Sequence, residues 1–122
     1  MRAFLDVLKS KNIPCGIATS NSRILTEAIL KSHQVENYFS VMVTGDEITN
    51  GKPDPEVYLE AARKLGVAPE HCLVFEDIPF GIMAGKRAGM TVCAVEDDYS
   101  MNDMEEKIRL ADFYIKSYEE LL

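Results

Sequence analysis

The stretch Cys72-Leu73-Val74-Phe75-Glu76-Asp77, followed by Pro79-Phe80-Gly81-Ile82, decides the fold of this 122-residue chain. Its first four residues form the short apolar run that is typical of a buried strand, and the two carboxylates mark the carboxyl end of that strand. In open α/β sheets, ligands collect in the crevice beyond the carboxyl ends of the strands. Two acids at that place indicate a site for a hard cation, most simply Mg²⁺, with Glu76 and Asp77 as its ligands.

Two other predicted loops carry polar groups that belong with these acids. Thr19 and Ser20 directly follow the apolar pair Ile17-Ala18, and Lys52 lies in the turn Asn50-Gly51-Lys52-Pro53-Asp54-Pro55. Because the carboxyl ends of parallel strands meet at one edge of a sheet, we expect these loops to face the same crevice. Hydroxyl groups, an ammonium group and metal-ligating carboxylates together indicate a site that handles phosphate.

Helical and strand patterns alternate along the whole chain. We expect helices at 2–11, 22–32, 55–65, 79–88 and 100–110, and strands at 15–18, 39–44, 72–75, 91–95 and 113–115. This alternation predicts an α/β fold in which a Rossmann-like parallel sheet lies between helices on both faces, three layers in all. At this length the chain is expected to form a single domain, residues 1–122.

Local signals predict the ends and inner faces of two helices. Asn21 and Ser22 are the candidate N-caps of the helix that runs to residue 32. The inner face of that helix is predicted to hold Leu25, Ala28 and Ile29. Asp54 should cap the helix 55–65, and Gly66 should end it. Its inner face is predicted to hold Tyr58, Ala61, Ala62 and Leu65.

Composition excludes some partners and suggests a cellular setting. A net charge of −7 argues against a nucleic-acid backbone or an anionic membrane as partner. The densest acidic stretch, 97–112, also holds Lys107 and is expected to form a solvated helix face.

Cys15, Cys72 and Cys93 fall in predicted strands without metal-site spacing, so we interpret them as small core residues. The odd cysteine count, without a signal-like or membrane-length apolar run, predicts a cytoplasmic protein.

Three ordered motifs resemble those of the haloacid dehalogenase superfamily, and most closely its β-phosphoglucomutase-like phosphatase branch. They are Ala18-Thr19-Ser20-Asn21, then Gly51-Lys52-Pro53-Asp54-Pro55, and then Phe75-Glu76-Asp77 followed by Gly81-Ile82-X-Ala84-Gly85 and Ala88-Gly89-Met90. The resemblance spans nearly the whole chain, and three motifs in this order make it specific. It implies the α/β core of that superfamily and Mg²⁺-dependent hydrolysis of phosphate monoesters. A small phosphorylated metabolite, such as a sugar phosphate, is the implied substrate.

The resemblance also implies a role for each motif residue. The implied phosphate-binding residues are Thr19, Ser20, Asn21 and Lys52. Thr19 would hydrogen-bond the transferring phosphoryl oxygens, and Lys52 would hold nucleophile and phosphate together, so both would be catalytic. Glu76 and Asp77 would hold Mg²⁺. Because adjacent strand residues point to opposite faces, we expect Asp77 to reach the ion directly and Glu76 to reach it through a bend or a water molecule.

The chain departs from the family pattern in two places. Ile78 stands where many relatives carry a small hydroxyl residue. The larger departure is the first family motif, Asp-X-Asp at the end of an N-terminal strand, whose first Asp is the nucleophile. No Asp here is followed two residues later by another, and the early Asp6 lies in a helical pattern. We therefore expect a carboxyl-terminal portion of such a protein, without the cap domain, that is catalytically inert alone.

In the family, the missing strand lies in the middle of the sheet, between the strands that end here at Ala18 and Phe75. Burying one large aliphatic side chain contributes about 1.5–3 kcal/mol. Losing a whole strand is therefore comparable with the net stability of a domain, about 5–15 kcal/mol. We expect one of three compensations: direct pairing of the two flanking strands, self-association, or binding of a complementing N-terminal fragment.

Other functions stay open. A phosphomutase of the β-phosphoglucomutase kind is the alternative enzyme, because the cap that largely sets substrate choice in this family is not among these residues. A non-catalytic module that binds phosphate or a partner through the same crevice is the alternative of a different class. A receiver-like signalling domain also combines acids, a hydroxyl residue and a Lys, but it places its acids first. Here Thr19 comes first and Glu76-Asp77 last.

Overall fold

The computed structural model describes residues 1–97 and 104–122. The main elements are α1 (Arg2–Ser10), β1 (Gly16–Ala18), α2 (Arg23–Ser32), β2 (Val41–Val43), α3 (Glu56–Leu65), β3 (Leu73–Glu76), α4 (Pro79–Arg87), β4 (Thr91–Val95), α5 (Met104–Leu110) and β5 (Phe113–Ile115). Short 3-10 helices lie at η1 (Glu36–Tyr38), η2 (Gly45–Glu47), η3 (Pro69–His71) and η5 (Tyr118–Leu121). The predicted alternation is confirmed, and the strands 91–95 and 113–115 agree residue for residue. The first residues of the helix predicted at 100–110 lie outside the described residues.

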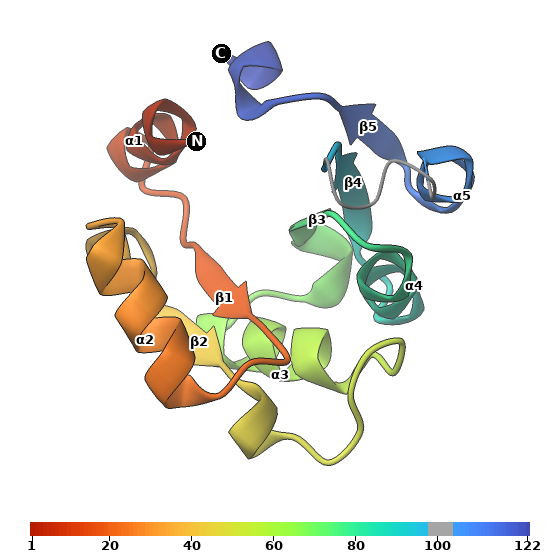
Figure 1. Cartoon of the computed structure of the whole chain (residues 1–122), viewed down its shortest axis with the longest axis horizontal. Helices are drawn as coiled ribbons and strands as arrows, with labels where there is room; N and C mark the ends of the chain where they lie inside the picture. The colour runs from red at the N-terminus through yellow and green to blue at the C-terminus, as the bar shows by residue number, and fades with distance from the viewer. Residues whose placement is uncertain (98–103) are drawn as a thin grey trace.

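All strand pairs are parallel, but the strands form two sheets. β1 pairs with β2, while β3, β4 and β5 pair in that order, which leaves β5 at an edge. Within the described ranges, no strand pairing joins β1 to β3, and the two sheets stand apart in Figure 1. Direct pairing of these two strands, one of the three expected compensations, is therefore wrong for this structure.

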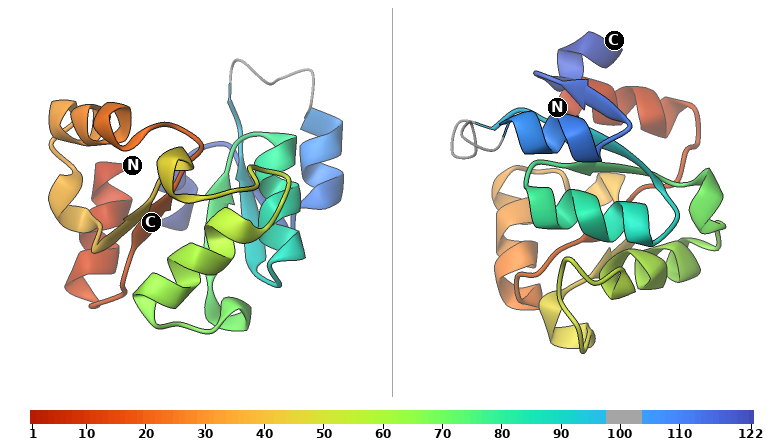
Figure 2. Two further views of the ribbon diagram at one scale, coloured as in Figure 1. Left: turned by 90° about the horizontal axis from the view of Figure 1, so that it is seen from below. Right: turned by 90° about the vertical axis from the view of Figure 1, so that its right-hand side faces the viewer.

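Helices cover both sides of the sheets. α3 packs on β1 and β2, and α4 packs on β3 and β4. α3, α4 and α5 follow one another along one side, as the left panel of Figure 2 shows, while α1 and α2 lie on the other side with η5 (Figure 1). The predicted three-layer arrangement is thus present around a divided sheet. None of the described helices has the length and apolar character needed to cross a lipid bilayer.

The main core lies between the strands and the helices α3 and α4. Its largest apolar members are Val43, Val57, Tyr58, Val74, Ile82, Met90 and Val92. The predicted inner face of α3 is confirmed for Tyr58, Ala61 and Ala62, which are all buried. The predicted end of α3 is confirmed, because Gly66 ends the helix with a φ of 73°. Positive φ favours glycine at that position. At the start, the Asp54 carboxylate accepts the Glu56 N–H at 2.9 Å, but the N-cap is Pro55 and the helix begins at Glu56, one residue later than predicted.

The inner face predicted for α2 is wrong. Leu25 and Ile29 are 49% and 43% exposed, and Ala28 is exposed as well. Thr26 is the buried residue of this helix. The N-cap prediction is confirmed, because the Ser22 hydroxyl oxygen accepts the Leu25 N–H at 3.3 Å. Helical spacing identifies residues that share a face, but it does not identify the face that a neighbouring element covers.

Three aromatic rings connect the two chain ends to the second sheet. Phe4 of α1 meets Phe75 of β3 at 5.4 Å between ring centroids, and Tyr118 of η5 lies 5.8 Å from Phe4 and 5.5 Å from Phe75. Offset and edge-on contacts at these distances are favourable for aromatic rings. The cluster therefore anchors α1 and the C-terminal segment on the face of β3 that is opposite to α3 and α4.

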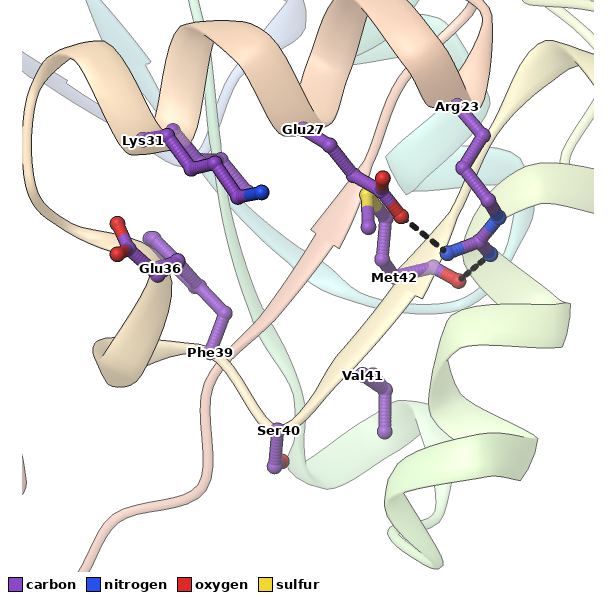
Figure 3. Close-up of a pocket in the computed structure, with 9 residues that line it drawn as sticks. Arg23, Glu27, Lys31, Glu36, Phe39, Ser40, Val41 and Met42 are labelled. Carbon is purple, nitrogen blue, oxygen red and sulfur yellow. Dashed lines mark hydrogen bonds and ion pairs between the residues drawn. The ribbon is translucent and has the colours of Figure 1, made fainter.

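Charged side chains close the outer edge of β2. The Met42 carbonyl oxygen accepts hydrogen bonds from Arg23 and Lys64, each at 3.3 Å, and the Glu47 carboxylate binds both cations at 2.9 Å. Figure 3 shows Arg23 reaching Met42 beside a groove of about 320 Å³ between α2, η1 and β2. Because the Met42 carbonyl already has donors, this edge is protected against pairing with a further strand.

We expect Glu47→Gln to lower the free energy of unfolding at pH 7 by about 1 kcal/mol, because it removes the anion that joins Lys64, Arg23 and the Thr44 N–H. The hydrogen bonds from Lys64 and from the Thr44 backbone lower the pKa of the Glu47 carboxyl from 4.5 to about 2. A carboxyl whose pKa is lower in the folded state stabilises that state above its unfolded pKa. The difference between wild type and variant should therefore be full above about pH 4.5 and shrink as the pH falls toward 2.

Urea titrations at pH 7, 4 and 2.5 measure this difference. Glu60→Gln is the matched control, because Glu60 pairs with Arg63 on the exposed surface of α3, and it should have the smaller effect. Equal effects of the two substitutions, or a Glu47→Gln deficit that does not change with pH, would contradict the structural role of Glu47.

Candidate functional site

The three predicted loops meet at the carboxyl ends of β1 and β3, on the upper side in the left panel of Figure 2. The Lys52 side chain connects these loops. Its ammonium nitrogen lies 2.8 Å from Glu76 Oε2 and 3.5 Å from the carbonyl oxygen of Ala18, the residue before Thr19. The Lys52 side chain thus reaches from the loop before α3 to the ends of two strands that belong to different sheets. The peptide bond from Lys52 to Pro53 is cis.

The Glu76 carboxylate is buried and has three hydrogen-bond donors. The Lys52 ammonium and the Tyr58 hydroxyl donate to Oε2, and the Asp77 N–H donates to Oε1 at 3.1 Å. Burial by itself would raise the pKa of the Glu76 carboxyl, but the charge of Lys52 and these hydrogen bonds outweigh it and hold the pKa below its ordinary value. Glu76 is therefore a buried, ionised carboxylate.

Gly81 provides the space that this carboxylate occupies. A Cβ added at Gly81 would lie 2.1 Å from the carboxyl carbon and from Oε2 of Glu76. Gly85, one turn later in α4, meets the strands instead, because a Cβ there would lie 2.7 Å from Val92 Cγ2. The two glycines of this helix therefore have different roles: Gly85 allows close packing on the sheet, whereas Gly81 makes room for a buried charge.

Asp77 lies at the exposed rim of the site. Partial loss of hydration raises the pKa of its carboxyl, and so do the hydrogen bond and charge of Glu76 and the charge of Asp97. Negative charge of this kind is what a bound divalent cation would offset. The described residues include no group of three or more His, Cys, Asp or Glu side chains that could hold a metal. Mg²⁺ commonly takes one or two carboxylates and keeps water or substrate phosphate as its other ligands, so Asp77 and Glu76 fit an open site of that type.

The loop that carries Thr19 forms a tight turn against η2. The Thr19 hydroxyl oxygen accepts the Asn21 N–H at 3.1 Å, and the Gly45 N–H donates to the Asn21 carbonyl at 2.8 Å. A Cβ at Gly45 would lie 2.3 Å from the Ser20 carbonyl oxygen, so only glycine permits this approach. The Thr19 hydroxyl can still donate its own hydrogen outward. Ser20 and Asn21 are both exposed next to it.

Other features of the molecule lie apart from this arrangement. Asp6 on α1 accepts the hydroxyl hydrogen of Tyr38, so it fastens α1 to η1. The groove in Figure 3 shares no lining residue with the Lys52 site. The sequence did not predict the parts that Tyr58, Gly45 and Gly81 play in the site, although Gly81 stands in the third motif. For Tyr58 the available signal was a hydroxyl group on an otherwise apolar helix face.

The chain is similar in sequence to known phosphatases. A family model described as haloacid dehalogenase-like hydrolase matches residues 1–95. The chain is 44% identical over 90 residues to a phosphorylated carbohydrates phosphatase of Thermotoga maritima, which covers 74% of this chain and 42% of that protein. It is 38% identical over 88 residues to a fructose-1-phosphate phosphatase of Escherichia coli, with coverages of 70% and 47%.

Solved structures share the fold. The structure of CbbY from Rhodobacter sphaeroides in complex with phosphate matches with a TM-score of 0.88 at 29% identity, and the match covers 98% of this chain and 53% of that one. The chain therefore spans about half the length of the relatives that it matches.

The tight approach of Gly45 to the Thr19 loop gives a prediction. Gly45→Ala should lower the free energy of unfolding by about 1–3 kcal/mol, because two backbone segments must separate to admit the methyl group. Gly51→Ala is the matched control: nothing lies within 4 Å of its added Cβ, so its effect should stay within about 0.5 kcal/mol. Urea unfolding of both variants measures the difference, and equal stabilities would show that the Thr19 loop is not packed as described.

Proposed function

This chain belongs to the haloacid dehalogenase-like hydrolase family, and from that membership we propose that it supplies the phosphate and metal site of a Mg²⁺-dependent phosphohydrolase. The proposed substrate is a small phosphorylated metabolite such as a sugar phosphate. One observation carries the proposal: the Lys52 ammonium binds Glu76 and reaches the end of β1 beside Thr19. The relatives named for phosphorylated carbohydrates and for fructose 1-phosphate support the substrate class.

Each residue has a distinct part in the proposed site. Thr19 donates its hydroxyl hydrogen to a phosphoryl oxygen, and the exposed loop residues Ser20 and Asn21 contribute further phosphate contacts. Lys52 offsets the negative charge that develops on the phosphoryl group. Asp77 and Glu76 would hold Mg²⁺, Glu76 with the carboxylate oxygen that Lys52 and Tyr58 leave open. The metal supplies a positive charge that polarises the phosphoryl oxygens.

The nucleophile is not among these site residues. Covalent phosphoryl transfer requires a nucleophile, and the chain has no Asp-X-Asp pair. Asp6, the early Asp, is bound by Tyr38 on another part of the surface. We therefore propose that this chain alone binds phosphate but does not turn over a phosphate monoester.

A strand between β1 and β3 would complete the sheet and the site together. Both strands have an unpaired edge among the described residues, and Lys52 lies where a strand between them would end. A carboxylate at the end of such a strand would meet the Lys52 ammonium. We propose that a complementing N-terminal segment, or a second copy of the chain, supplies this strand. Sedimentation that finds the isolated chain to be a compact monomer would exclude both.

Two other functions use the same residues. A phosphomutase of the β-phosphoglucomutase kind would bind its phosphate as proposed here, and product analysis with a hexose 1-phosphate on a complemented protein separates it from a phosphatase. A non-catalytic phosphate-binding or partner-binding module would use the same crevice without a nucleophile. Turnover after addition of the missing strand would count against that module.

Calorimetric titration of the chain with inorganic phosphate tests the proposal. Phosphate should bind more tightly when Mg²⁺ is present, and Lys52→Ala should weaken binding by about tenfold or more, because it removes a charged hydrogen-bond donor. Asp77→Ala should remove the Mg²⁺ dependence. Lys11→Ala, at an exposed position after α1, is the control and should leave binding unchanged.

Activity on nitrophenyl phosphate provides the second measurement. We expect the chain to show no turnover above that of Lys52→Ala. Turnover that disappears in Asp77→Ala would refute the proposed inertness of the chain alone, and phosphate binding that is the same in wild type and Lys52→Ala would refute the site.

A further inference from the structure

We infer that Tyr58 is a positioning residue of this site: its hydroxyl group fixes the Glu76 carboxylate and thereby holds the Lys52 ammonium at the carboxyl ends of β1 and β3. The consequence for ligand binding rests on the proposed function, whereas the positioning itself can be measured without any ligand. Tyr58 does not reach the rim where phosphate would bind, so it acts through Glu76 and Lys52.

Tyr58 contacts both members of the ion pair. It lies on the inner face of α3, where it is 6% exposed, and its hydroxyl donates to Glu76 Oε2. The same oxygen accepts the Lys52 ammonium. The Lys52 nitrogen also lies 5.1 Å from the centre of the Tyr58 ring, within the range of a cation–π contact. One side chain therefore contacts the anion through its hydroxyl group and the cation through its ring.

The Glu76 carboxylate needs this donor because of where it sits. A buried carboxylate is costly unless donors satisfy its oxygens, and Oε2 has its two donors in Lys52 and Tyr58. The space available to the carboxylate exists because Gly81 has no side chain. Tyr58 and Gly81 therefore determine the position of Glu76 together: the hydroxyl attracts the carboxylate, and the glycine leaves room for it.

Lys52 depends on that position in turn. It has a long, flexible side chain in the loop before α3, and the loop is supported near it by a hydrogen bond from Arg87 to the Pro53 carbonyl at 3.3 Å. The ammonium group is directed by Glu76, by the more distant Ala18 carbonyl and by the Tyr58 ring. A cation that must neutralise a phosphoryl group acts best when its position is set in advance. Tyr58 supplies that preorganisation.

Tyr58→Phe tests the hydroxyl group alone, because it keeps the ring that packs in the core and faces Lys52. The first readout is competitive acetylation of lysine amines by limiting reagent, with Lys52 measured against the exposed Lys11 by mass spectrometry. Lys52 labelling should rise by about threefold to tenfold, the factor that corresponds to loss of one hydrogen bond. Tyr38→Phe is the matched control, since its hydroxyl binds Asp6 on α1, and it should leave Lys52 labelling unchanged.

Gly81→Ala tests the same Lys52–Glu76 ion pair by acting on Glu76. Its methyl group would displace the Glu76 carboxylate and should also raise Lys52 labelling, while Tyr58 keeps its hydroxyl group. The second readout is titration of Tyr58→Phe with inorganic phosphate. Phosphate binding should weaken by about threefold to tenfold.

The outcomes separate this inference from the proposed function. Unchanged Lys52 labelling in Tyr58→Phe overturns the positioning role. Raised labelling in both Tyr58→Phe and Gly81→Ala supports it. If phosphate binding in Lys52→Ala equals that of wild type, the proposed function fails, and the labelling result still decides whether Tyr58 positions Lys52.

Discussion

The buried ion pair between Lys52 and Glu76 is the interaction on which the site depends. The two side chains are 11% and 8% exposed, and their charged atoms lie 2.8 Å apart. Removing two charges from water is costly, and the attraction between them compensates only when further hydrogen bonds satisfy the remaining lone pairs. Here Tyr58 and the Asp77 N–H provide those bonds. The pair also links the carboxyl ends of β1 and β3, which belong to two separate sheets.

Local features of the chain shape the ion pair and its surroundings. Gly81 leaves space for the carboxylate, and Gly45 brings the loop of Thr19 against η2 next to the same edge. Tyr58 places a hydroxyl group on the otherwise apolar inner face of α3. The divided sheet thus carries a preorganised cationic group, the Lys52 ammonium, which contacts the carboxyl ends of both β1 and β3. A parallel strand inserted there would bring its own end group to Lys52.

The sequence was sufficient for those features that depend on local patterns. Helix and strand order, the Gly66 end and the buried face of α3 follow from spacing and turn chemistry, and the structure confirms them. The three-loop arrangement followed from the rule that parallel strands end at one edge. The interaction of Tyr58 with Glu76 could not be predicted, because it joins residues 18 positions apart on different elements.

Tertiary contacts explain the two predictions that were wrong for α2 and for Lys107. The apolar residues of α2 have helical spacing, yet Leu25 and Ile29 are largely exposed, because helical spacing does not determine what covers a helix. Lys107 was expected on a solvated face among acids, but it is 1% exposed and its ammonium binds the Val95 carbonyl at 2.8 Å. A long lysine side chain can cross from a helix to the end of a strand, which charge patterning alone does not reveal.

A double-mutant cycle with Lys52→Met and Glu76→Gln tests the central claim most directly, with the free energy of unfolding as the measured quantity. Each single substitution should destabilise the chain by about 3–5 kcal/mol, because it leaves a buried charge without its partner. The double variant should be more stable than the sum of the two losses predicts, with a coupling of about 1–3 kcal/mol. Losses that simply add would show that Lys52 and Glu76 do not interact, and would contradict this account of the site.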